Sequence, residues 1–142
     1  MFVPSVEIKQ YQRQYRDKVK RIVMNLQKYY PDIENWWEQK EAKKLDDGTD
    51  YCLMVLTGTD EVVGVAISGL EREGTAKLKT FYLSDEVGGY SLGVTLLKKV
   101  LNYWMDKRVR RIFVTFAEEE LEELRGFFDK FGFLMDGFEP NF

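Results

Sequence analysis

The chain has 142 residues, 44% of them hydrophobic and 15% aromatic, which suits one domain with a real core and excludes a disordered chain. It contains no histidine, which excludes Ser-His and Cys-His nucleophile pairs and metal sites built on imidazole. The single cysteine, Cys52, can form no internal disulfide, and the sequence shows neither a secretory signal nor an apolar run of about 20 residues, so we expect a cytoplasmic protein without a membrane span.

The net charge of −3 is distributed unevenly along the chain. Residues 1–44 carry an excess of basic side chains, mostly on the first predicted helix, whereas residues 45–142 carry an excess of acidic ones. A solvated helix face explains such a charge run, and a docking face for an acidic partner or a nucleic acid is the alternative. Because the whole chain is negative, nucleic-acid binding is the weaker interpretation.

The first third of the sequence predicts a strand followed by two helices. Phe2–Lys9 has the pattern of a strand, and its proline suits an edge position in a sheet. Apolar side chains recur at three- and four-residue spacing between residues 11 and 30, which predicts one face of a helix. Asp32 is placed to cap a second helix over Ile33–Leu45.

The rest of the chain predicts an antiparallel meander and then alternating helices and strands. Tyr51–Gly58 and Glu61–Gly69 are apolar runs around a short turn, which is a hairpin signal, and Ala76–Ser84 follows as a third strand. A long helix with one apolar face comes next, then a strand of buried type, Arg110–Ala117. A helix that ends at Gly132 and a short last strand complete the pattern.

The order β-α-α-β-β-β-α-β-α-β predicts a single α/β domain over residues 1–142 with a mixed central sheet. Because helices separate the last strands, that part of the sheet can run parallel after an antiparallel start. A sheet of this kind opens a crevice at the C-terminal ends of its strands, where the strand order changes.

The stretch DEVGGYSLGVTLL, residues 85–97, joins the third strand of the meander to the long helix. Gly88 and Gly89 leave the backbone bare where the helix begins, and Ser91 adds a hydroxyl. Free N–H groups and the helix dipole at such a position suit a diphosphate. The pattern is neither G-x-x-x-x-G-K nor G-x-G-x-x-G, which argues against an NTPase and a dinucleotide-binding fold. A plain strand-to-helix connection is the alternative.

The strand–turn–helix TFYLSDEVGGYSLGVTLL resembles motif A of the GNAT superfamily of N-acetyltransferases. In that motif R/Q-x-x-G-x-G/A and then x-x-L-L follow a hydrophobic strand. Residues 88–93 occupy the six motif positions here, and Leu96 and Leu97 follow at the expected place. FFDKFGF (Phe127–Phe133) is similar to the family's l-Y-e-k-l-G-F, and EVVGVAISG to its usual third strand. The order of elements resembles the family over nearly the whole chain.

The resemblance implies a GNAT-type domain that binds acetyl-CoA (acetyl-coenzyme A) as a cosubstrate and needs no metal. The pyrophosphate would lie on the amides of residues 88–93, and the pantetheine arm between Thr80–Leu83 and Ile112–Phe116. The acceptor amine would attack the thioester directly. The residues expected to bind the coenzyme are Phe81, Tyr82, Leu83, Gly88, Gly89, Tyr90, Ser91, Leu92, Gly93 and Phe128.

Two positions depart from the family pattern. Gly88 stands at the Arg/Gln position, and Phe128 stands where a tyrosine often protonates the departing thiolate. Tyr82 and Tyr90 are alternative acids, since a phenol with a pKa near ~10 can protonate a thiolate. Glu86 is a candidate base. Packing, exposure and helix capping are the structural interpretations of these three side chains, so the catalytic residues stay open.

We expect acetyl transfer to a primary amine on a small molecule, a protein N-terminus or lysine, or an aminoacyl group. Lys77 and Lys79 alternate on one face of a strand, and if they line the acceptor cleft they favour an acidic or neutral acceptor over a polyamine. A non-catalytic coenzyme A-binding or regulatory module is the alternative from another class, because Gly88 and Phe128 depart from the family pattern. A homodimer that shares a last strand is also open.

Overall fold

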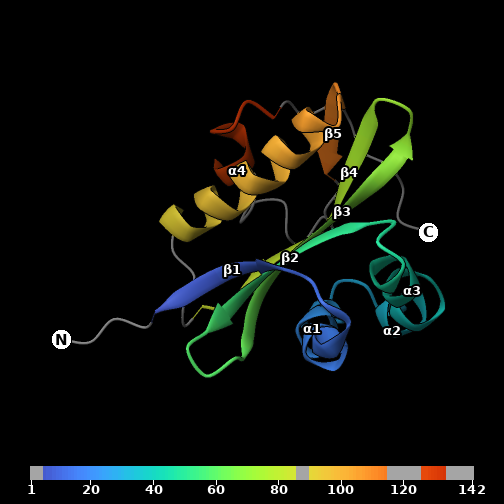
Figure 1. The fold of residues 1–142 in the computed structure, drawn as a ribbon, viewed down its shortest axis with the longest axis vertical. Coiled ribbons are helices and arrows are strands. Elements are labelled where there is room, and N and C mark those ends of the chain that lie inside the picture. The colour runs from blue at the N-terminus through green and yellow to red at the C-terminus, as the bar shows by residue number, and fades with distance from the viewer. Residues whose placement is uncertain (1–4, 86–89, 115–125, 134–142) are drawn as a thin grey trace.

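The computed structural model describes residues 5–85, 90–114 and 126–133, and within them the chain forms a five-stranded sheet in the order β1-β2-β3-β4-β5 (Figure 1). The strands are β1 (Val6–Gln10), β2 (Tyr51–Thr57), β3 (Val62–Arg72), β4 (Thr75–Leu83) and β5 (Arg111–Val114). The first four strands pair antiparallel, and β4 pairs parallel with β5. The predicted hairpin, meander and mixed sheet are therefore confirmed.

Helices cover both faces of this sheet. They are η1 (Arg13–Tyr15), α1 (Arg16–Val23), η2 (Met24–Leu26), α2 (Ile33–Trp36), η3 (Trp37–Glu41), α3 (Ala42–Asp46) and α4 (Tyr90–Asp106). Figure 1 shows α4 on one side of the sheet and α1, α2 and α3 on the other. Two separate apolar clusters result, one beneath α1 to α3 and one beneath α4. None of the helices in the described residues has the length and hydrophobicity that crossing a bilayer requires.

The predicted helix over Ile33–Leu45 forms, but a π-helical turn interrupts it and its predicted N-cap is absent. Its middle turn, η3, is a π-helix, whose backbone hydrogen bonds span one residue more than those of an α-helix. Asp32 does not cap it: its backbone (φ −94°, ψ 15°) is not extended as a capping residue requires, and its carboxylate accepts a hydrogen bond from Asn35 Nδ2 at 3.0 Å instead.

The ends of the chain were predicted only in part. Within the described residues the first strand spans Val6–Gln10, one residue further than the predicted end at Lys9, and residues 2–4 of the prediction lie outside them. The strand pairs with β2 alone among the described strands, which agrees with an edge position. Residues 126–129 are helical, and Gly132 takes a left-handed conformation (φ +84°) as the helix ends. The rest of the predicted last helix and the predicted last strand beyond Phe133 lie outside the described residues.

One irregularity in β4 sets which side chains reach each face of the sheet. Ser68 pairs with Leu78 and Ile67 pairs with Thr80, so Lys79 is an extra residue that forms a β-bulge. Leu78 belongs to the cluster under α4, and beyond the bulge the alternation is reversed. The parallel pairing of β4 with β5 runs from Thr75 and Arg111 to Leu78 and Val114. Residues 80–83 therefore extend beyond the last described pair.

The apolar face of α4 is confirmed by burial. Leu96, Leu97 and Val100 are fully buried, and Trp104 donates a hydrogen bond from Nε1 to Ser68 Oγ at 2.8 Å. The side chains of α4 fill the space above β3 and β4 and so hold the described part of this helix against the sheet.

We expect Leu97→Ala to lower the free energy of unfolding by about 2–5 kcal/mol, because it leaves a cavity in the cluster beneath α4. Urea denaturation measures the change. Lys98→Ala on the exposed face of the same helix is the control, and its effect should stay within about 0.5 kcal/mol. Equal losses in the two variants would contradict the described packing of α4.

Candidate functional site

The strand–turn–helix unit is present in the order that the sequence predicted. β4 ends at Leu83 and α4 begins at Tyr90. Glu86, Gly88 and Gly89 lie outside the described residues, so their predicted roles stay predictions. Ser91 is exposed, and its backbone carbonyl accepts a hydrogen bond from Thr95 Oγ1 at 3.0 Å.

Gly93 has a structural reason to lack a side chain. A Cβ atom there would lie 3.3 Å from Cε2 of Phe127 and 3.7 Å from Cδ1 of Leu83. The start of α4 therefore packs closely against the end of β4 and against the helical turn at residues 126–129. Leu92 is half-buried in the same cluster. These contacts hold the beginning of α4 beside the final residues of β4.

Three of the predicted coenzyme-binding residues pack together on the α4 face of the sheet. Phe81, Leu83 and Phe128 belong to one apolar cluster. The rings of Phe81 and Phe128 lie 6.0 Å apart in an edge-to-face arrangement, and only 2% of Phe128 is exposed. Phe128 thus contacts the strand where the resemblance places the coenzyme, and it does so as a packed aromatic side chain.

Tyr82 lies on the opposite face of the sheet. It pairs with Val65 and packs against the cluster beneath α1 to α3. Its hydroxyl accepts a hydrogen bond from Asn25 Nδ2 at 3.4 Å. The β4 residues that the sequence grouped together are therefore divided between the two faces, because the chain is extended there.

The structure brings together a charged cluster that the sequence did not predict, which we call the Glu41–Asp50–Lys79 triad. Lys79 Nζ donates hydrogen bonds to Asp50 Oδ2 at 2.6 Å and to Glu41 Oε1 at 3.2 Å. The side chains of Glu41, Asp50 and Lys79 are 1%, 3% and 12% exposed, so this is a buried ion-pair network. The other Glu41 oxygen, Oε2, is buried and has no hydrogen-bond partner among the residues that the structure describes.

Three separate segments build the triad. Glu41 comes from the last position of η3, Asp50 directly precedes β2, and Lys79 is the bulge residue of β4. Gly69 of β3 makes room for it, since a Cβ atom there would lie 2.1 Å from Asp50 Oδ1. Asp50 therefore reaches across β3 to Lys79 only because the intervening residue is glycine.

The protonation of the triad follows from its composition of two carboxyl groups and one ammonium. Burial and, after it, the neighbouring Asp50 carboxyl raise the pKa of Glu41 to about 8, and Lys79 offsets only part of this rise. Burial by itself lowers the pKa of Lys79, but the hydrogen bond to Asp50 and the charges of both carboxylates outweigh it and raise the pKa. Lys79 thus stays charged, and Glu41 titrates close to neutral pH.

A sequence signal for Glu41 existed. It follows Trp37 by four residues and precedes Leu45 by four, so it interrupts a buried stripe of the second helical region. A charged residue within such a stripe is buried only when it is paired. The partner of Glu41 is Lys79, which the sequence analysis did single out. Lys79 lies on the same face of its strand as Lys77. Lys77 is not part of the triad, and its Nζ lies 5.8 Å from the centre of the Phe113 ring.

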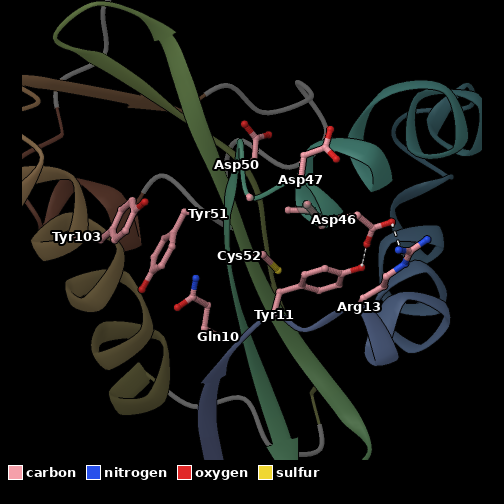
Figure 2. A pocket seen from close by; sticks show the side chains of 11 residues that line it. Gln10, Tyr11, Arg13, Asp46, Asp47, Asp50, Tyr51, Cys52 and Tyr103 are labelled. Carbon is pink, nitrogen blue, oxygen red and sulfur yellow. Dashed lines mark hydrogen bonds and ion pairs between the residues drawn. The ribbon is translucent and has the colours of Figure 1, made fainter.

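A pocket of about 300 Å³ (Figure 2) includes one member of the triad in its lining. Asp50 belongs to both. On the side of α4, Tyr51 and Tyr103 stack with their ring centres 3.6 Å apart. On the side of the other helices, Tyr11 donates a hydrogen bond from its hydroxyl to Asp46 Oδ1 at 2.7 Å. The pocket is thus lined by aromatic rings and carboxylates.

The comparison with protein-family models identifies one family. Residues 11–133 match the family model described as the acetyltransferase (GNAT) family. No curated protein matches the chain in sequence.

Solved structures share the fold. A GNAT-family acetyltransferase from Staphylococcus aureus Mu50 is 18% identical with a TM-score of 0.73, and the match covers 96% of this chain and 90% of that one. An aminoglycoside N-acetyltransferase in complex with CoA is 11% identical with a TM-score of 0.77, over 99% and 95% of the two chains. The PaiA N-acetyltransferase from Thermoplasma acidophilum, in complex with coenzyme A, is 15% identical with a TM-score of 0.69, over 89% and 88%.

The raised pKa of Glu41 predicts how stability depends on pH. Because the folded state holds this proton up to about pH 8 and the unfolded state releases it near its ordinary pKa of 4.5, the free energy of unfolding should fall as pH rises between these values. We expect Glu41→Gln to lose this decline, which urea denaturation at several pH values measures. Glu38→Gln, the same change on the exposed side of the turn, should retain it. A decline of equal size in the Glu41 variant would show that another group causes it.

Proposed function

The chain belongs to the acetyltransferase (GNAT) family, and from this premise we propose that it transfers an acetyl group from acetyl-CoA to a primary amine. The family match over residues 11–133 supports the reaction class. Two proteins that share the fold are N-acetyltransferases in complex with CoA, which supports the cosubstrate.

The observation that carries the proposal is the geometry at the end of β4. Its described parallel pairing with β5 ends at Leu78 and Val114, and residues 80–83 continue toward the beginning of α4. We place the pantetheine arm along these residues and the pyrophosphate at the amides of residues 88–93. In the described register Ile112 pairs with Ala76, so the predicted second wall of this cleft, 112–116, reaches residues 80–83 only with positions outside the described residues.

The reaction makes its main demand on the acceptor amine and not on the coenzyme. The amine attacks the thioester carbon once it is neutral, a C–N bond forms, the C–S bond breaks, and the sulfur leaves as thiol after taking a proton. The enzyme must bind the amine, remove its proton and hold it near the thioester. An amine with a pKa near ~10 is mostly protonated at pH 7, so removal of this proton is the demanding step.

The charged side chains near the proposed site bear on which acceptor can bind. The sequence interpretation used Lys77 and Lys79 as two positive charges on the acceptor side. Lys79 is neutralised by Glu41 and Asp50, so one of these charges is already paired. In the adjacent pocket the Asp46 carboxylate is paired with Arg13 and Arg16, at 4.0 and 3.4 Å. The pairing of Lys79 removes one reason to expect an acidic acceptor, and the acceptor class is left to experiment.

A coenzyme-binding module without catalysis is the second candidate. Phe128 is the observation that favours it, because this side chain is packed, aromatic and unable to donate a proton where the family often has a tyrosine. The two candidates share the coenzyme site and differ in whether an amine is acetylated.

We expect acetyl-CoA to raise the melting temperature of the protein, since a ligand that binds only the folded state stabilises it by mass action. Gly89→Asp should abolish this increase, because it places a negative charge and bulk at the phosphates. Gly58→Asp, the same change in the exposed β2–β3 turn, should leave it intact. An increase that survives Gly89→Asp would place the coenzyme elsewhere.

We expect release of coenzyme A thiol from acetyl-CoA to depend on an added amine and to become faster between about pH 7 and 9, as more of the amine is neutral. A panel of aliphatic amines, peptides and aminoacyl compounds identifies the acceptor class. Tight coenzyme binding without acceptor-dependent thiol release for the whole panel would favour the binding module.

A further inference from the structure

The pocket of about 300 Å³ has no part in the proposed coenzyme site (Figure 2). It lies where β1 ends and β2 begins, and its lining includes Gln10, Tyr51 and, from the last part of α4, Tyr103. Tyr103 follows the first residue of α4, Tyr90, by thirteen positions, which is about 20 Å along an α-helix. The pocket is therefore far from the beginning of α4, where the pyrophosphate is placed.

The sheet also separates the pocket from the end of β4. Tyr51 pairs with Ser68 of β3, whereas Leu83, the last residue of β4, pairs with Gly64 of β3. Ser68 and Gly64 are four positions apart, which is about 13 Å along a strand. The whole of β3 also lies between β2 and β4. A molecule in this pocket would therefore occupy a second site and leave the proposed coenzyme site free.

Three tyrosine side chains line the pocket, and the described contacts hold them in place. Tyr51 is stacked on Tyr103 with ring centres 3.6 Å apart and planes 3° from parallel, so Tyr103 covers one face of the Tyr51 ring. The hydroxyl of Tyr11 is held by its hydrogen bond to Asp46 Oδ1 at 2.7 Å. Figure 2 shows Tyr51 and Tyr11 on either side of Cys52. Aromatic rings fixed in this way present faces of negative potential, which attract cations.

The carboxylates of the lining differ in how their charges are compensated. Asp46 is paired with two arginines, and Asp50 is paired with Lys79. Asp47 is exposed, and in the part of the chain that the structure describes its carboxylate has no ion-pair or hydrogen-bond partner. The side-chain amide of Gln10 likewise has no partner among the described residues. The pocket thus combines tyrosine rings with one carboxylate whose charge is not compensated.

We propose that this pocket binds a small organic cation, whose alkylated ammonium head lies against the tyrosine rings while the carboxylate of Asp47 balances its charge. An alkylated head suits the site, because its methyl groups contact the rings and its charge is attracted to their faces. The volume of about 300 Å³ is at the lower end of the range of roughly 300–1,000 Å³ for ligand pockets, so the ligand is of the size of choline.

The test compares choline with 3,3-dimethyl-1-butanol, which has the same shape but carries a carbon atom in place of the charged nitrogen. Both are titrated into the protein without acetyl-CoA, and NMR of the backbone amides reports where and how tightly they bind. We expect choline to shift the signals of residues 10–13 and 46–52. It should bind about 3- to 30-fold more tightly than the alcohol, which is the gain expected of a cation on an aromatic ring.

Two side chains of the lining are tested by substitution. Asp47→Asn should weaken choline binding about 2- to 5-fold, as for an exposed ion pair, and leave the binding of the alcohol unchanged. Glu73→Gln removes one negative charge from the exposed β3–β4 turn and should change neither. Tyr51→Phe keeps the ring and should retain choline binding, whereas Tyr51→Leu removes the ring and should lose most of it.

Three results would overturn the inference. The first is equal affinity for choline and the alcohol, and the second is a choline titration that shifts none of the pocket amides. The third is unchanged choline affinity in Asp47→Asn, a variant that alters only an exposed side chain and so leaves the packed core intact. The proposed function does not depend on these results, because acetyl-CoA binding and thiol release are measured without choline.

Discussion

The bulge at Lys79 is the constraint on which the arrangement of this molecule depends. Upstream of it, Ala76 and Leu78 face α4; downstream, Phe81 and Leu83 face α4 although their positions have the opposite parity. If Lys79 were paired regularly instead of forming a bulge, Tyr82 would turn toward α4 and Phe81 would leave its aromatic neighbours, because strand side chains alternate with a period of two. One inserted residue thus allows β4 to fill the apolar cluster at both ends and still present a lysine to the other face.

The bulge places Lys79 in a buried charged cluster, and burying these charges lowers the stability of the fold. Moving two carboxylates and an ammonium out of water carries a desolvation penalty that their mutual attraction repays only partly, and apolar side chains of similar size are often as stable or more so. The cost is higher here because Glu41 Oε2 has no described partner and because two carboxyl groups share one ammonium, so that Glu41 keeps its proton at neutral pH. Packing alone gives no reason for such a cluster. A chemical role therefore has to be considered beside a structural one.

Much of the fold could be predicted from local patterns. The β2–β3 hairpin, the meander and the apolar face of α4 each depend on residues close in sequence, and each is found as expected. The bulge could not be predicted, because the alternation AKLKT at residues 76–80 gives no sign of an extra residue. Asp32 has the residue type of a helix cap but not the backbone conformation. The triad depends on three distant segments and on the bare backbone of Gly69, and no single stretch of sequence contains that information.

The absence of histidine from the sequence connects these points. A chain without imidazole has no side chain whose ordinary pKa lies near neutrality, so proton transfer at neutral pH requires that some other group be moved there by its surroundings. Burial beside a second carboxylate does this to Glu41, and the charge of Lys79 limits the shift. A module that only bound coenzyme would need the β4–α4 connection and nothing of this cluster. The triad lies on the opposite face of the sheet from α4, where a coenzyme-binding role leaves it unexplained and an amine acceptor would give it a use.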